Sequence, residues 1–133
     1  MEQKEINTLG ASLRRINQRL LKARSNEKEI VKVWYQGGEP YFDLFVELQD
    51  QQVKWLQFTL RGRSMWWNEQ LRRWETGRTN EMQNDENSFH PASAIIEPDP
   101  EANVPFVKLT QEILSTRAGE EIFDQMLCLF EGR

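Results

Sequence analysis

The chain of 133 residues contains only one cysteine and one histidine. Because a disulfide needs two thiols, Cys128 cannot form one within the chain, and no oxidising compartment is implied. Cys128 lies in the apolar stretch MLCLF, where we expect a small buried thiol rather than a reactive one. Zinc sites usually draw on several cysteines and histidines. We therefore expect neither a bound metal nor a cofactor.

Catalytic motifs are equally scarce. His90 stands beside Pro91 in a polar, acidic stretch that offers no support for a serine–histidine or cysteine–histidine arrangement. No glycine-rich phosphate loop or dinucleotide fingerprint is present. The acids of the same stretch lack the spacing of a calcium loop, and we interpret them as solvated: Asp85, Glu86, Glu97, Asp99 and Glu101. The expectation is a protein that is not an enzyme, and the enzymatic alternative is a site of converging carboxylates.

Long hydrophobic runs are also missing. No apolar stretch approaches the roughly 20 residues of a membrane span, and MEQKEINTLG does not resemble a signal peptide. We expect a cytoplasmic protein that does not bind membranes. The net charge is −4, but residues 1–24 carry six basic and two acidic side chains, whereas 81–104 carry six acids and no base. These two segments could attract each other within or between chains, or remain separately solvated.

The first predicted element is an amphipathic helix over residues 5–24. Its apolar residues follow a 3-4-3-4 spacing: Ile6, Leu9, Leu13, Ile16 and Leu20. The stripe is too short to argue for a coiled coil, so we expect this helix to lie on a sheet.

Residues 29–77 predict an antiparallel meander sheet. The stretches 29–36 and 41–49 are rich in β-branched and aromatic residues and flank Gly37-Gly38, a two-residue hairpin signal. If these glycines close the hairpin, Val33 faces Phe42 on one side and Trp34 faces Tyr41 on the other.

The next strand, 53–60, raises a conflict between its turn and its faces. A two-residue Asp50-Gln51 turn would pair Glu47 with Lys54 but would place the apolar rows on opposite faces. A three-residue loop would set Leu56 opposite Val46 and Phe58 opposite Leu44. Burial should outweigh one exposed ion pair, so we expect the longer loop. The Arg61-Gly62 turn then sets Phe58 against Met65.

The remaining chain is predicted in three parts. Residues 65–77 favour a short hairpin, although the i, i+4, i+7 spacing of Trp67, Leu71 and Trp74 also fits a helix. Residues 78–104 form an acidic, proline-bearing loop or linker, which is either ordered or disordered. Residues 105–131 form two helices that break near 117–119.

Together these patterns predict a single α+β domain over residues 1–133. It consists of an N-terminal helix, a three- to five-stranded antiparallel meander sheet, and C-terminal helices packed on one sheet face.

The second sheet face is the predicted functional surface, because helices can cover only one face of a small sheet. Large aromatic side chains among polar residues are typical of a protein interface. We therefore expect a protein-binding module, adaptor-like or chaperone-like, that binds another protein or itself as a homodimer. The expected protein-binding residues are Trp34, Tyr41, Phe45, Trp55, Trp66 and Trp74. The alternative is that the C-terminal helices, or the linker through Ile95 and Ile96, fold over these rings.

A nucleic-acid interface is the second functional hypothesis. Tryptophans in 55–74 could stack on bases, and the phosphate ligands would be Arg61, Arg63, Arg72, Arg73 and Arg78. Against it, the isoelectric point is near 5.1, whereas affinity for a polyanion needs a net positive footprint. We rank this hypothesis behind protein binding.

Overall fold

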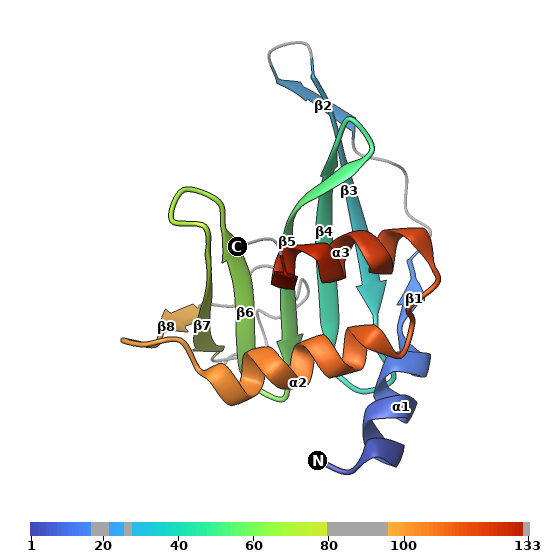
Figure 1. Ribbon diagram of the computed structural model, residues 1–133, viewed down its shortest axis with the longest axis vertical. Coiled ribbons are helices and arrows are strands. Elements are labelled where there is room, and N and C mark those ends of the chain that lie inside the picture. Colours follow the sequence, from blue (N-terminus) through green and yellow to red (C-terminus); the bar gives the residue numbers. More distant parts are fainter. Residues whose placement is uncertain (17–21, 26–27, 80–95, 132–133) are drawn as a thin grey trace.

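The computed structural model describes residues 1–16, 22–25, 28–79 and 96–131, and these form one antiparallel sheet with helices against one face (Figure 1). The helices are α1 (Gln3–Ser12), α2 (Val104–Ser115) and α3 (Glu121–Glu131). The strands are β1 (Arg14–Arg15), β2 (Lys22–Ser25), β3 (Lys28–Gln36), β4 (Asp43–Gln49), β5 (Gln52–Leu60), β6 (Arg63–Asn68), β7 (Arg73–Thr79) and β8 (Ile96–Pro98). Their order is β1-β3-β4-β5-β6-β7-β8, and β2 also pairs with β3. The predicted α+β architecture is confirmed, with eight described strands rather than three to five.

The N-terminal helix is shorter than predicted. It ends at Ser12, and the assignment of 5–24 as one helix is wrong, because the chain next pairs with the outer edge of β3 through β1 and β2. Leu13 is already extended, at φ −68° and ψ 124°, and the Ile16 N–H donates to the Trp34 carbonyl at 2.9 Å. An apolar 3-4 spacing cannot reveal that a sheet edge with free hydrogen-bonding groups lies beside the helix. Leu20 lies outside the described residues.

The β3–β4 hairpin has a longer loop than Gly37-Gly38 predicted. Val33 pairs with Val46 and Trp34 with Phe45, so the expected pairings with Phe42 and Tyr41 are wrong by four residues. The side chains still lie on the predicted faces of the sheet, because a register shift of four residues, an even number, keeps their alternation. The reason for the shift is that Phe42 is fully buried and its ring lies against Gly37, where a Cβ would come within 2.0 Å of it. The loop therefore carries a core residue.

The β4–β5 hairpin resolves the conflict seen in the sequence. Its turn is the two-residue one, with Asp50 at φ 53° and Gln51 at φ 69°, which is typical of a type I′ turn. The expected three-residue loop is therefore wrong. A bulge restores the apolar rows instead, because Leu48 pairs with Val53 and Glu47 with Trp55, which leaves Lys54 as the extra residue.

The faces expected for the following strands are confirmed. Val46 pairs with Leu56, and Phe58 pairs with Leu44 on one side and Met65 on the other. Residues 65–77 form the predicted hairpin, as β6 and β7, and not the alternative helix.

The C-terminal part agrees with the two predicted helices. Asn103 caps α2 by accepting from the Phe106 N–H at 3.1 Å, and the break before α3 contains Gly119 at φ 104°. Within the predicted linker, β8 pairs with β7; residues 80–95, with His90 and Ile95, lie outside the described residues.

The core lies between the sheet and its helices. In Figure 1, α2 and α3 both cross the near side of the sheet. Phe106 of α2 contacts Phe58, and Phe123 of α3 contacts Tyr35 edge-on, with ring centroids 6.0 Å and 5.2 Å apart. Among the described helices, none has the length and apolar character needed to cross a membrane.

Candidate functional site

Four aromatic side chains share the sheet face that α2 and α3 leave uncovered. The pairings Trp34–Phe45, Glu47–Trp55 and Gln57–Trp66 place them on the face opposite the aliphatic core positions. We call this surface the aromatic face, defined by Trp34, Phe45, Trp55 and Trp66. All four side chains are half-buried. The sequence prediction that most indole rings point away from the helices is therefore correct for these positions.

The polar atoms of the aromatic face are engaged within the chain. Trp34 stacks on Phe45 with centroids 5.7 Å apart and an interplanar angle of 13°, and its Nε1 donates to Asp43 at 3.0 Å. Trp66 Nε1 donates to Glu75 at 3.2 Å. Because both indole N–H groups are already paired, the accessible parts of these rings are apolar.

Glu75 is the main acceptor at this edge of the aromatic face. Its carboxylate accepts from Asn68, Trp66 and Arg73 at 3.0, 3.2 and 3.3 Å. The hydrogen bond from Asn68, followed by those from Arg73 and Trp66, holds the pKa of Glu75 below its usual value despite some burial. Glu75 is therefore a fixed negative charge that orients the Trp66 ring.

One end of the same face is closed to solvent. Asp43, Thr59 and Ser64 are neighbours in the register, and their exposures are 1%, 9% and 0%. The hydroxyls of Thr59 and Ser64 are hydrogen-bonded at 2.9 Å. The accessible part of the face is consequently its aromatic part.

Two residues of the predicted protein-binding set lie elsewhere. Trp74 is on the helix side, where it stacks on Phe130 at 4.4 Å and packs edge-on against Trp67 at 5.0 Å. Tyr41 lies in the β3–β4 loop at φ 59° rather than in a strand. Neither residue therefore belongs to the aromatic face, since alternation fixes a face only once the strand and its register are known.

The five arginines of the nucleic-acid hypothesis do not form one surface. Arg63 and Arg78 are partners in the register, whereas Arg72 and Arg73 lie at the opposite end of the β6–β7 hairpin. Arg61 donates to Glu39 at 2.9 Å and to Glu5 at 3.1 Å. Arg72 and Arg73 are paired with Glu69 and Glu75. Three of the five charges therefore already have acidic partners.

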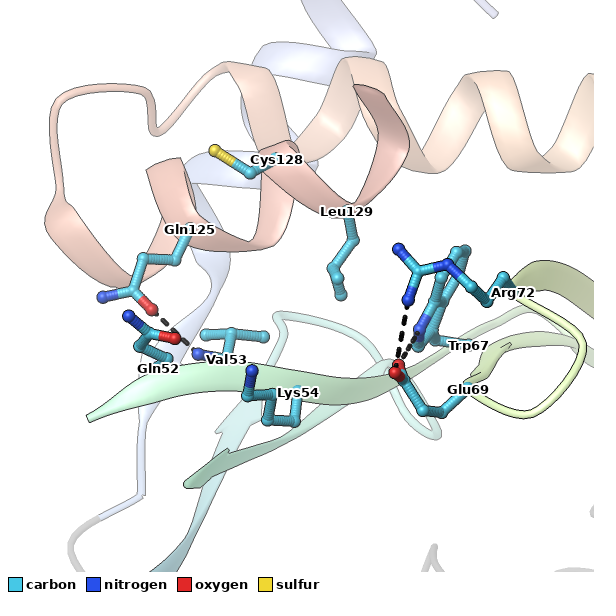
Figure 2. Close-up of a pocket in the computed structure, with 9 residues that line it drawn as sticks. All are labelled: Gln52, Val53, Lys54, Trp67, Glu69, Arg72, Gln125, Cys128 and Leu129. Atoms are coloured by element: carbon cyan, nitrogen blue, oxygen red, sulfur yellow. Dashed lines mark hydrogen bonds and ion pairs between the residues drawn. The ribbon is translucent and has the colours of Figure 1, made fainter. Parts of the chain in front are cut away.

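An open cavity lies on the helix side of the sheet, between α3, the start of β5 and the β6–β7 loop (Figure 2). Its volume is about 550 Å³. The lining residues are Gln52, Val53, Lys54, Trp67, Glu69, Arg72, Gln125, Cys128 and Leu129. The sequence analysis did not predict this cavity. The available signal was the conflict between the Asp50-Gln51 turn and the apolar rows, which indicated an extra residue near Lys54.

Gln125 forms one wall by fastening α3 to the β4–β5 hairpin. Its Oε1 accepts from the Val53 N–H at 2.8 Å and its Nε2 donates to the Gln51 carbonyl at 3.2 Å. At the opposite wall, Glu69 accepts from Trp67 Nε1 at 2.8 Å and from Arg72 at 3.4 Å. Figure 2 marks the Gln125–Val53, Trp67–Glu69 and Arg72–Glu69 hydrogen bonds with dashed lines. The cavity is thus bounded by side chains whose positions are fixed by hydrogen bonds.

Cys128 is exposed, so the expectation of a buried thiol is wrong. On α3 the buried positions are Phe123, Met126 and Phe130, which form one helical stripe. Cys128 lies off that stripe. An apolar run on a short helix shows its buried face only when the neighbouring sheet is known.

Acidic residues do not gather into a metal site in the described part of the chain, where no group of three potential ligands is present. Asp99 accepts from the Thr76 hydroxyl at 2.6 Å, whereas Asp85 and Glu86 lie outside the described residues.

Comparison of the chain with models of protein families, with curated proteins and with solved structures found no match.

Proposed function

We propose that the chain is a non-enzymatic protein-binding module that associates with a second copy of itself through the aromatic face. The observation that carries this proposal is the shared, half-buried position of Trp34, Phe45, Trp55 and Trp66 on the side without helices. Aromatic side chains supply large contact areas at low entropic cost, and they are enriched among the interface residues that contribute most to the binding free energy.

The charges on this face favour a second copy over a strongly charged partner. Lys32 lies 4.0 Å from Glu47, and Arg73 lies 3.3 Å from Glu75, so these two acids each have a basic partner. A two-fold axis brings a patch against itself, and a patch of one sign would repel its copy. A patch with both signs can instead pair crosswise.

The test is the oligomeric state in solution. Sedimentation equilibrium over a range of concentrations should show a reversible dimer for the natural chain. Trp55→Ala, alone and with Phe45→Ala, should shift the equilibrium toward the monomer, since truncation of a central aromatic side chain costs an interface about 2 kcal/mol or more. Trp55 is chosen because its side chain makes no hydrogen bond in the described part of the chain, so that the substitution removes none.

Leu71→Ala is the matched control, because Leu71 is a large hydrophobic residue, 55% exposed, in the β6–β7 loop and outside the strands that carry this face. Circular dichroism should confirm that every variant remains folded. A natural chain that stays monomeric at all concentrations would overturn the proposal. So would a dimer that Leu71→Ala weakens as much as Trp55→Ala does.

A further inference from the structure

We propose that the cavity beside α3 binds a small organic anion with an apolar body, such as an alkyl carboxylate. This inference goes beyond the proposed function, because the cavity lies on the helix side of the sheet and the aromatic face lies on the other. Its volume of about 550 Å³ falls within the range of ligand pockets, roughly 300–1,000 Å³.

The inner part of the cavity is apolar. Val53 and Trp67 are 7% and 2% exposed, and the half-buried Leu129 extends from α3 toward β5 in Figure 2. An alkyl chain laid against these side chains would leave water on transfer, which strengthens binding about fourfold for each buried methylene.

The rim carries one positive charge that no described residue neutralises. The Glu69 carboxylate is already shared by Trp67 Nε1 and Arg72, so the acid at the cavity has its partners. The Lys54 ammonium lines the same cavity and has no hydrogen bond or ion pair in the described part of the chain.

The β-bulge explains how Lys54 comes to line this cavity. In a regular strand, alternation would place the residue after Val53 on the opposite face. Because Lys54 is the extra residue between the Leu48–Val53 and Glu47–Trp55 pairs, the strand is locally kinked there. Bulges often re-aim side chains beside functional sites. The chain thus sets a cation beside an apolar floor, which is the complement of an amphipathic anion.

The probe is octanoate, with hexanoate and octylammonium as comparisons. Binding is followed by the ¹H–¹⁵N signal of the Trp67 indole, whose N–H donates to Glu69 at the cavity wall. The Trp66 indole, on the other sheet face, is the internal reference. Octanoate should shift the Trp67 signal and leave the Trp66 signal in place. Hexanoate should bind roughly tenfold more weakly because it has two methylenes fewer.

Lys54→Gln should weaken octanoate binding by about fivefold, the effect of one exposed ion pair, and Lys32→Gln, on the other face, should have no effect. Leu129→Trp fills the cavity and should abolish binding while Lys54 remains. All three variants are checked for folding by the unchanged Trp66 signal. The proposal is overturned if octylammonium binds as well as octanoate, if Lys54→Gln equals Lys32→Gln, or if octanoate leaves the Trp67 signal unmoved. None of these results depends on the oligomeric state.

Discussion

Arg117, in the loop between α2 and α3, donates a 2.7 Å hydrogen bond to the main-chain oxygen of Leu13. The same Nη1 donates to the Gly10 carbonyl at 2.9 Å, and the guanidinium lies 4.7 Å from the centroid of the Phe123 ring. A cation that satisfies the last carbonyls of a helix also complements its dipole. Arg117 therefore closes the C-terminal end of α1 and fastens it to the C-terminal helices.

Substitution of Arg117 should destabilise the fold. Arg117→Ala removes two charge-assisted hydrogen bonds to main-chain carbonyls at the C-terminal end of α1, and we expect a loss of about 2–3 kcal/mol in the free energy of unfolding. Urea titration followed by tryptophan fluorescence measures this value. Arg72→Ala is the control, because that side chain is 58% exposed, and it should change the stability by less than about 0.5 kcal/mol. Equal effects of the two substitutions would contradict the capping role.

Gly10→Ala should destabilise the protein, although helix propensity alone predicts a gain of about 0.5–1 kcal/mol. A Cβ at Gly10 would lie 1.8 Å from Thr116 Oγ1 and 2.9 Å from the Ile113 carbonyl oxygen, so α1 would have to move away from α2. Thermal unfolding of Gly10→Ala should show a lower midpoint, and Thr116→Ala in the same chain should restore only part of it because the Ile113 contact remains. A raised midpoint for Gly10→Ala would show that the two helices are not in close contact.

Deletion of Lys54 should be tolerated. Without it, Leu48–Val53 and Glu47–Trp55 become successive pairs of a regular ladder, and the alternation of faces is preserved. We expect a folded protein whose free energy of unfolding differs from that of the natural chain by about 1 kcal/mol or less. Deletion of Gln57, in the middle of β5, is the contrasting variant, because it reverses every following side chain of the strand. If the Lys54 deletion is as disruptive as the Gln57 deletion, the bulge is required for folding.

Stability should fall at both extremes of pH. A hydrogen bond from Arg61 to Glu39, and one from Arg117 to Glu120, hold the pKa values of these carboxyls below their usual range. The folded chain thus binds fewer protons than the unfolded chain in acid. The stabilisation is present above the ordinary carboxyl pKa of about 4.3 and is lost as the pH falls through the lower folded values. Burial raises the pKa of Tyr35, so its contribution is present below about pH 10 and is lost at higher pH.

Urea midpoints between pH 3 and 7 measure the acid effect. Glu39→Gln with Glu120→Gln should flatten this dependence, because neither glutamine titrates. Glu97→Gln, at an exposed position of β8, should leave it unchanged. An equally steep dependence in the double variant would assign the acid sensitivity to other groups.

The alternation of residue types was sufficient to predict which side of the sheet most strand residues occupy. Val33, Val46 and Leu56 lie on the core side and Trp34 on the other, as the pattern indicates, because burial of one face penalises any odd shift of register. The two C-terminal helices and their break were predictable for a similar reason, since their apolar stripes cannot share one straight helix.

What the sequence by itself determined is the class of fold and the division of side chains between two faces, because both follow from local periodicity and burial. Only the tertiary structure decided where α1 ends, which loop carries Phe42, and on which side Trp74 lies, because each depends on groups distant in the chain. Arg117 caps α1 from 104 residues beyond Leu13, and Trp74 is held by Phe130 of α3. The cavity beside α3 likewise exists only where helix and bulge meet, which no local pattern encodes.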